Sequence, residues 1–326
     1  MTPLLEVEDL RTHFPVRGGV FLRARAVAKA VDGVSFQIAG GETLGLVGES
    51  GCGKSTLGKT IVRLLKPTAG RIRFEGADLA TLTRAQLKPI RRHLQMVFQD
   101  PVESLNARQT VGEILAEPFV IHGIGRPAER GRQVAELLGR VGLESDAVHR
   151  YPFEFSGGQR QRIGIARALA LQPRLIICDE PVSALDVSIQ SQVLNLLVEL
   201  QRALGLSYLF IAHNLAVVKH VSDRIAVMYL GRIVELGPAD GVYRRPRHPY
   251  TQALLAAIPT PDPARVRERR PLANGDLPSP INPPPGCPFH PRCPHATDFC
   301  RTNVPLLRQV PDAGGESHVV ACHYDL

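Results

Sequence analysis

The chain has 326 residues, of which 44% are hydrophobic and 21% charged, a composition typical of a folded globular protein. The net charge of +8 is compatible with nucleic acid, an anionic membrane surface or a polyphosphate ligand, and does not choose among them. No apolar run approaches the ~18 residues of a transmembrane helix, and acidic residues interrupt the N-terminal segment where a signal peptide is apolar. We therefore expect a cytoplasmic chain that works at a membrane only if another subunit spans it.

Strand and helix patterns alternate from the N-terminus to about residue 240. Apolar runs of strand length predict buried strands at 42–48, 94–98, 175–178 and 207–212. Two further strand patterns are a half-buried strand at 71–76 and a hairpin at 224–237 that turns at Gly231. This alternation predicts an α/β fold with a mainly parallel sheet that is covered on both sides.

Helical periodicity fills the intervals between these strands. A helix is expected at 55–65, and another at 191–205 with Gly205 as its C-cap. The second helix has one apolar face, made of Val193, Leu196, Leu197, Leu200 and Leu204. Segments 110–117 and 130–143 are helical with no strand between them, which indicates a helical insertion at about residues 100–165.

The composition changes after Arg244. Sixteen of the 27 prolines follow that residue, and a short amphipathic helix expected at 248–259 leads into a loop-rich tail. This change predicts a first domain at 1–243 and a C-terminal extension at 244–326. Because the extension has few apolar runs, we expect it to contribute little to the core.

A phosphate-binding pattern follows the first buried strand. In GESGCGKST, Gly48, Gly53, Lys54 and Ser55 have the spacing G-x-x-x-x-G-K-[ST], between a strand and a helix as the motif requires. Glycines let backbone N–H groups surround phosphate oxygens, whereas the alternative is a plain glycine turn. Lys54 is expected to reach the β- and γ-phosphates, and Ser55 to ligate Mg²⁺. The predicted loop contacts to nucleotide are Gly48, Glu49, Ser50, Gly51, Cys52, Gly53, Lys54, Ser55 and Thr56, with Cys52 as a filler position.

Two acidic residues end the strand in LIICDEP. Asp179 is placed to hold Mg²⁺ and Glu180 to polarise an attacking water. A lone Asp-Glu pair is commonly two solvated acids, but downstream of a phosphate loop it predicts a Mg-nucleotide site. Gln99 and His213 end two other strands, at the sheet edge where ligands bind in open α/β folds. The Mg²⁺ contacts predicted from these residues are Ser55 and Asp179.

The segment FSGGQRQR, residues 155–162, matches the signature motif of ATP-binding cassette (ABC) proteins. The other motifs of that family occur in order: the phosphate loop, the Q-loop at Gln99, CDEP, the D-loop and the H-loop at His213. The D-loop residues are Ser183, Ala184, Leu185 and Asp186. From residue 4 to about 240 the chain therefore resembles an ABC-type P-loop nucleotide-binding domain. The resemblance implies a RecA-like parallel-sheet core plus a helical subdomain, with residues 244–326 as a small cysteine-cluster extension.

The resemblance also implies roles for individual residues. Two cassettes of this family pack head to tail, so the signature motif contacts the partner's ATP; its residues are Ser156, Gly157, Gly158 and Gln159. Glu180 would be the general base and His213 would contact the γ-phosphate. Gln99 would contact Mg²⁺ and water and link to the transmembrane partner, and Phe14 occupies the position that stacks on adenine. The family usually has Asp after the H-loop histidine, where this chain has Asn214.

Longer stretches, such as VFQDPVESLNAR and RHPYTQALL, resemble the ATP-binding subunits of bacterial dipeptide and oligopeptide importers, most closely the second ATPase subunit of the dipeptide system. This implies ATP-driven peptide uptake from the cytoplasmic face of the membrane. The implied partners are a paralogous ATPase subunit, two transmembrane permease subunits and an extracytoplasmic peptide-binding protein, without nucleic acid. Nickel or another small cargo and an identical cassette partner stay open. A soluble ABC protein acting on nucleic acid or ribosomes and a metal-regulated binding module without turnover also stay open.

Four cysteines gather in the extension: Cys287, Cys293, Cys300 and Cys322. Their spacing, C-x5-C-x6-C-x21-C, lacks the C-x(2–4)-C start of most structural zinc sites. From the residues alone, an iron–sulfur cluster, zinc and free thiols stay open, and nearby histidines allow a mixed zinc site: His290, His295, His318 and His323. Because importers of this subfamily hold a [4Fe–4S] cluster on matching cysteines, the resemblance implies such a cluster, with zinc as the alternative. We expect it to hold the loops together, and redox sensing is the other role considered.

Overall fold

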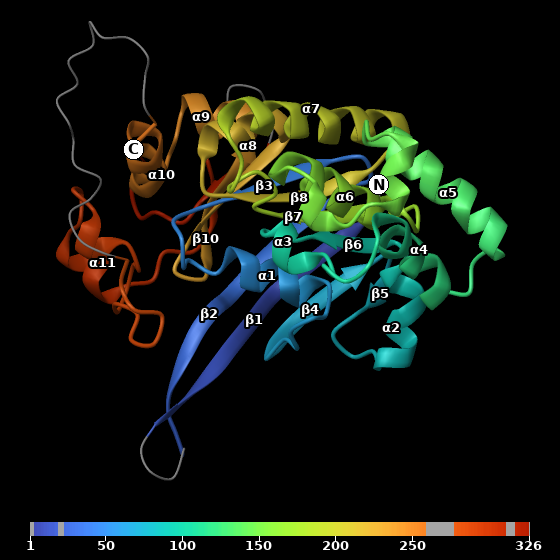
Figure 1. Ribbon diagram of the computed structural model, residues 1–326. Helices are drawn as coiled ribbons and strands as arrows, with labels where there is room; N and C mark the ends of the chain where they lie inside the picture. The colour runs from blue at the N-terminus through green and yellow to red at the C-terminus, as the bar shows by residue number, and fades with distance from the viewer. Residues whose placement is uncertain (1–2, 19–22, 259–276, 311–316, 326) are drawn as a thin grey trace, which may run out of the picture. The chain divides into compact units, whose positions relative to one another are not determined.

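The computed structural model describes residues 3–18, 23–258, 277–310 and 317–325 (Figure 1). The chain divides into two compact units. Unit 1 consists of Met1–Ala39, Thr43–Thr81 and Phe210–Leu326, and unit 2 of Gly40–Glu42 and Leu82–Leu209. The phosphate loop and the C-terminal extension thus belong to one unit, and the predicted boundary between residues 243 and 244 stays a prediction.

An antiparallel sheet of unit 1 was not predicted. Its strand order is β2-β1-β4-β5, with bounds Arg23–Ile38, Leu5–Gly18, Ala69–Phe74 and Ala77–Asp78. Leu5 pairs with Ile38 on one side and with Phe74 on the other, and all three side chains are buried. Register shifts interrupt the pairing of β1 with β2, so the regular alternation that identifies a strand in sequence is lost.

The second sheet of unit 1 joins parallel and antiparallel strands. Its order in this unit is β11-β12-β10-β9-β3, with bounds Arg308–Val310, His318–Val320, Arg232–Pro238, Arg224–Tyr229 and Thr43–Val47. β3 is parallel to β9 and the other pairs are antiparallel. The hairpin predicted at 224–237 is confirmed, since Leu230 and Gly231 turn with φ of 43° and 77°. The sheet is therefore mixed here.

The extension contributes to the core, contrary to expectation. β12 pairs with β10 through Glu235 and Val320, and β11 adds a further strand. Phe289, Val310 and Val320 are 1%, 4% and 1% exposed. The prediction of little core was wrong because scattered apolar residues are buried between loops and short strands rather than in long runs.

Figure 1 labels the α-helices of unit 1. They are α1 (Lys54–Ile61), α8 (Leu215–Val221), α9 (Ala239–Arg244), α10 (Pro249–Ala256) and α11 (Asp298–Thr302). The helix predicted at 55–65 forms but ends at Ile61, and Arg63 has a left-handed φ of 57°. The helix predicted at 248–259 forms as α10 but ends at Ala256, and residue 259 lies outside the described residues.

In unit 2, β6 (Leu94–Val97) pairs in parallel with β7 (Leu175–Asp179). β8 (Ser207–Ala212) continues from this unit into unit 1. The remaining helices are α2 (Arg84–Arg91), α3 (Pro101–Ser104), α4 (Val111–Ile121), α5 (Pro127–Arg140), α6 (Gly157–Leu169) and α7 (Val187–Leu204).

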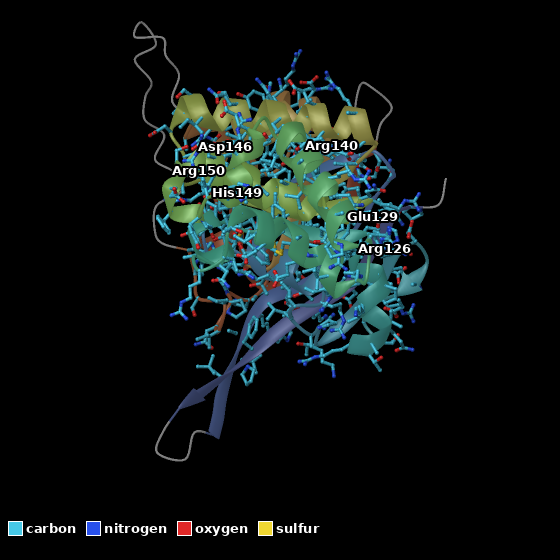
Figure 2. All side chains as sticks on the ribbon, turned by 45° about the vertical axis from the view of Figure 1, so that its right-hand side comes forward. Arg126, Glu129, Arg140, Asp146, His149 and Arg150 are labelled. Atoms are coloured by element: carbon cyan, nitrogen blue, oxygen red, sulfur yellow. The ribbon has the colours of Figure 1, made fainter. Side chains whose placement is uncertain are left out.

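The predicted helical insertion contains α4 and α5. Figure 2 shows Arg126 and Glu129 at the start of α5 and Arg140 at its end. The Glu129 carboxylate accepts the Arg126 N–H at 2.7 Å and so caps this helix. Of the described helices, none combines the length and the apolar content needed to cross a lipid bilayer.

The apolar face predicted on α7 is largely confirmed. Val193, Leu196, Leu197 and Leu200 are at most 8% exposed, and Gly205 caps the helix with φ 64°. Leu204 was wrongly included in this face, because it is 41% exposed in the last turn.

Candidate functional site

Backbone conformation shapes the phosphate loop between β3 and α1. Gly51 and Gly53 have φ of 83° and 107°, which non-glycine residues rarely adopt. A Cβ on Gly53 would lie 2.0 Å from the Ala30 carbonyl oxygen, and one on Gly48 would lie 2.2 Å from the Met228 carbonyl oxygen. The loop therefore needs glycine at these positions, and its curled backbone can present N–H groups to an anion.

Lys54 begins α1 and is 4% exposed. Its Nζ donates to the carbonyl oxygens of Gly48 (2.8 Å) and Glu49 (2.9 Å), which hold the ammonium within the loop. Cys52 is buried beside it, and burial raises the pKa of its thiol. A raised pKa disfavours the reactive thiolate, which agrees with a filler position.

In unit 2, Glu180 follows β7 in a left-handed conformation, with φ 45°. Such backbone strain in a residue other than glycine is common at functional sites. Gln99 Nε2 donates to Glu180 Oε2 at 3.1 Å, so the two residues predicted to handle the attacking water are in contact. Asp179, 2% exposed, is the last residue of β7.

The D-loop is attached to the same glutamate. Ser183 Oγ donates to the Glu180 carbonyl oxygen at 3.1 Å. Asp186 is the N-cap residue of α7. The backbone of Glu180 is thus held by the segment that follows it.

The signature motif forms the start of α6. Ser156 is the N-cap, and its hydroxyl and the Gln159 side chain make a capping box. A Cβ on Gly158 would lie 2.4 Å from Ile189 Cγ2, so α6 can pack here only with glycine. Ser156 and Gly157 are exposed, which leaves the N-terminal N–H groups of α6 available to an anion from outside.

The remaining predicted site residues lie in unit 1. His213 is exposed directly after β8, and Asn214 caps α8 by accepting the Ala216 N–H at 2.9 Å. Asparagine caps a helix as well as aspartate does. Asn214 therefore serves as the cap although the family usually has Asp at this position. Phe14 is 39% exposed on β1, opposite Ala28 of β2.

The structure brings the four cysteines of the extension together. They line one pocket of unit 1 with several histidines: Cys287, Cys293, Cys300, Cys322, His290, His295 and His323. Burial raises the pKa of Cys287 to about 11. His318 does not line this pocket, because it is buried on β12 and its Nε2 contacts Glu235 at 2.8 Å. Among the described residues, no three His, Cys, Asp or Glu side chains are arranged as ligands of one metal ion.

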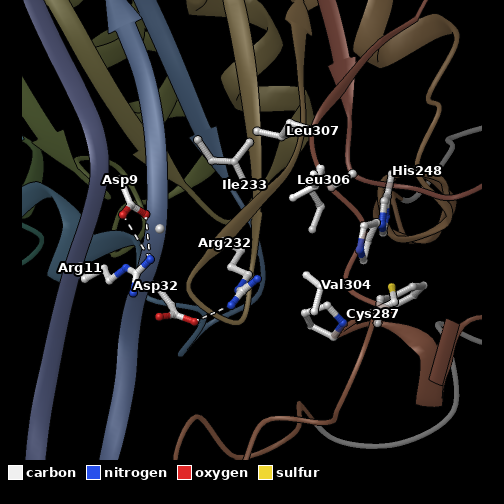
Figure 3. Close-up of a pocket in the computed structure, with 16 residues that line it drawn as sticks. Asp9, Arg11, Asp32, Arg232, Ile233, His248, Cys287, Val304, Leu306 and Leu307 are labelled. Atoms are coloured by element: carbon white, nitrogen blue, oxygen red, sulfur yellow. Dashed lines mark hydrogen bonds and ion pairs between the residues drawn. The ribbon is translucent and has the colours of Figure 1, made fainter. Parts of the chain in front are cut away.

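A second pocket of unit 1 lies beside the extension (Figure 3). The ion pair between Asp32 and Arg232, at 2.7 Å, lines it together with Cys287 and the apolar residues Leu306 and Leu307. Leu306 is 81% exposed. No motif indicated this pocket, because its walls come from segments far apart in sequence.

Sequence reasoning also missed two residues that contact the phosphate loop. Arg292 forms an ion pair with Glu49 at 2.9 Å, and the Tyr250 hydroxyl accepts the Glu49 N–H at 2.8 Å. Both come from beyond residue 243, which no local pattern connects to the loop.

Two family profiles match the chain. Residues 31–183 match the ABC transporter family, and residues 234–300 match the C-terminal region of oligopeptide/dipeptide transporters. The chain is 55% identical over 322 residues to the oligopeptide transport ATP-binding protein AppF of Bacillus subtilis, covering 98% of this chain and 97% of that protein. It is 53% identical to OppF of Salmonella typhimurium, an oligopeptide transport ATP-binding protein, covering 98% and 95%.

Solved structures of ABC proteins share the fold. CbiO1 of Clostridium perfringens, part of an ABC transporter complex, aligns with TM-score 0.64 and 28% identity, covering 75% of this chain and 92% of that one. The ATP-binding cassette MJ0796, a dimer bound to ADP and phosphate in a post-hydrolysis state, aligns with TM-score 0.64 and 27% identity, covering 72% and 98%.

Proposed function

The chain belongs to the family of ATP-binding subunits of oligopeptide and dipeptide ABC transporters, and we propose that it hydrolyses ATP to drive peptide uptake through separate permease subunits. The observation that carries this proposal is the end-to-end similarity to oligopeptide transport ATP-binding proteins, which includes the C-terminal region as well as the cassette. The cargo assignment rests on the names of those relatives, so nickel or another small solute is the alternative cargo.

ATP binding is proposed to depend on the curled loop from Gly48 to Thr56. Its N–H groups, with the N-terminus of α1, would bind the phosphates, and Lys54 would reach the β- and γ-phosphates. The oxygen-bearing side chains of Ser55, Gln99 and Asp179 suit Mg²⁺, which prefers oxygen ligands; the bound ion would neutralise phosphate charge. Phe14 is exposed on β1, as stacking against adenine requires.

Hydrolysis is proposed to use Glu180 as general base. Its contact with Gln99 supports this role, because a base must be oriented as well as ionised. His213, exposed at the end of β8, would contact the γ-phosphate. The exposed start of α6 would bind the ATP of a second cassette, in the head-to-tail dimer of this family.

The proposed assembly contains a paralogous ATPase subunit, two permease subunits and an extracytoplasmic peptide-binding protein, with this chain peripheral on the cytoplasmic face. An identical second cassette is the alternative for the first partner. A soluble ABC protein acting on nucleic acid or ribosomes is the rival function. Co-purification of membrane permeases with the tagged chain supports the transporter, whereas ribosomes or nucleic acid would support the rival.

We further propose that the cysteine pocket holds a [4Fe–4S] cluster. Four cysteines lining one cavity support this, because a cubane cluster takes four thiolates at separate irons. A cluster bound there would hold the loops of the extension together. Metal analysis and visible absorption of protein purified without oxygen test the proposal: about four irons per chain support a cluster, and stoichiometric zinc without iron would replace it.

The central experiment is Glu180→Gln in the reconstituted transporter. The variant keeps the size of the side chain and removes the base, so peptide-stimulated phosphate release should fall by about 100-fold or more, and peptide uptake should stop. ATP binding should persist. Unchanged hydrolysis in Glu180→Gln would contradict the assignment of this residue.

A further inference from the structure

Glu49 of the phosphate loop contacts the C-terminal extension through its side chain and its backbone. Arg292 Nη1 and Nη2 donate to the two carboxylate oxygens of Glu49 at 2.9 and 3.0 Å, a bidentate ion pair. The Arg292 side chain is 7% exposed and that of Glu49 is 24% exposed.

The backbone of the same residue has a separate contact. The Glu49 N–H donates to the hydroxyl of Tyr250, a residue of α10 that is 1% exposed. The Tyr250 ring packs edge-on against Tyr229 at 4.7 Å and lies 5.5 Å from Phe289. Because three buried aromatic rings hold one another, the hydroxyl that accepts the loop N–H has little freedom to move.

These contacts bear on the residue that reaches the phosphates. The carbonyl oxygen of Glu49 accepts from Lys54 Nζ at 2.9 Å. The peptide groups on either side of Glu49 are thus held by Tyr250 on one side and by Lys54 on the other. A shift of Glu49 would move the lysine ammonium with it.

The negative charge of Glu49 also bears on nucleotide binding. A carboxylate in a loop that binds a polyphosphate repels its ligand unless a cation compensates it. Arg292 supplies that cation at hydrogen-bond distance, and its fork geometry orients the carboxylate. The extension therefore contributes both charge balance and orientation to the loop.

We propose that Arg292 and Tyr250 are positioning residues of the nucleotide site, through which the C-terminal extension sets the affinity of the phosphate loop for ATP. The inference rests on the proposed ATP binding and adds a role for the extension in it. Arg292 adjoins Cys293, so the segment that carries the ion pair also carries a wall of the cysteine pocket.

The test is titration of the purified full-length chain with a fluorescent ATP analogue and with ATP as competitor. Arg292→Gln should weaken ATP binding about tenfold, because the half-buried carboxylate of Glu49 is left without its cation. Arg292→Lys, which keeps the charge and loses the bidentate geometry, should lose less. Glu49→Gln combined with Arg292→Gln should recover most of the affinity, since the unpaired charge is gone. Tyr250→Phe keeps the ring and should weaken binding several-fold.

The matched control is Arg301→Gln, because Arg301 lies in the same extension with its side chain 67% exposed; it should bind ATP like the parent chain. In the assembled transporter, Arg292→Gln should raise KM for ATP more than it lowers kcat, a division that a general loss of folded protein does not produce. If Arg292→Gln fails to fold, Arg292→Lys and Tyr250→Phe carry the test.

Parent-level affinity in Arg292→Gln and Tyr250→Phe would overturn this inference alone. So would a double variant that binds no better than Arg292→Gln. A parent chain without ATP binding would overturn the proposed function, and this inference with it.

Discussion

At the residue scale, the phosphate loop depends on a position where a side chain cannot be placed. Gly53 has φ 107°, and an added Cβ would lie 2.0 Å from the Ala30 carbonyl oxygen. Gly53→Ala should therefore lower the free energy of unfolding by about 3 kcal/mol, from strain and a backbone clash together, and abolish ATP binding. Chemical denaturation and nucleotide titration measure the two effects.

Gly40→Ala is the control for this substitution. A Cβ there would have no neighbour within 4 Å, and Gly40 does not have the positive φ that strains a side chain. Its stability should stay within about 0.5 kcal/mol of the parent. If Gly40→Ala and Gly53→Ala changed stability and ATP binding equally, the geometry of the phosphate loop would not explain the effect of Gly53→Ala.

Lys54 has a different part in the same loop. Its ammonium is held by two carbonyl oxygens, and it is the one cationic side chain of GESGCGKST, which we propose reaches the phosphates. Lys54→Ala should weaken ATP binding by about 10- to 100-fold, since hydrogen bonds to charged groups contribute about 1.5–3 kcal/mol. Lys59→Ala, in the last turn of α1, is the control and should bind normally. Wild-type affinity in Lys54→Ala would count against the assignment of this loop.

Individual residues also show which parts of the candidate site can be predicted from the sequence. The phosphate loop, the acidic strand end and the signature motif could be predicted because each is a contiguous pattern on one element. The contact between Gln99 and Glu180 could only be inferred from a family scheme. The pairing of Glu49 with Arg292 could not be predicted, because 243 residues separate them and neither belongs to a periodic segment.

At the scale of elements, β10 anchors the extension through a buried carboxylate. Glu235 is 0% exposed, accepts the N–H groups of Arg247 (2.8 Å) and His248 (3.0 Å), and contacts His318 of β12. Glu235→Ala leaves these donors without their acceptor, so the free energy of unfolding should fall by about 3–5 kcal/mol.

Limited proteolysis followed by mass spectrometry locates the effect of this variant. Glu235→Ala should be cut within residues 244–326 sooner than the parent chain, because the link between β10 and β12 is weakened. Glu144→Ala is the control, since Glu144 is exposed and makes no side-chain capping bond. Cleavage that is unchanged in Glu235→Ala would mean that other contacts attach the extension.

Some strands could be predicted from the sequence and others could not, and the difference has a physical reason. β3, β7 and β8 are buried throughout and appear in the sequence as continuous apolar runs. The long strands β1 and β2 pair through bulges and carry charged residues, so neither an apolar run nor a clean alternation marks them. The extension is held by short strands, a buried aromatic cluster and the hydrogen bonds and ion pairs of individual residues. These features produce almost no periodic pattern in the sequence.

At the scale of the whole molecule, the role proposed for the signature motif would make hydrolysis depend on a second cassette. The exposed N-terminus of α6, at Ser156 and Gly157, would contribute to the ATP site of the partner rather than to that of its own chain. Ser156→Arg places a long side chain where the partner's phosphates would lie. Hydrolysis by the assembled transporter should fall by at least about tenfold, because one ATP site is obstructed.

The same variant separates assembly from nucleotide binding. The isolated Ser156→Arg chain should bind ATP like the parent, since its own phosphate loop is intact, and its low hydrolysis should not rise when partner subunits are added. Arg140→Gln, at an exposed residue in the last turn of α5, is a control that should leave stimulation by the partners in place. Full hydrolysis in a transporter containing Ser156→Arg would place the completing contacts of the ATP site elsewhere, and the head-to-tail dimer would have to be abandoned for this chain.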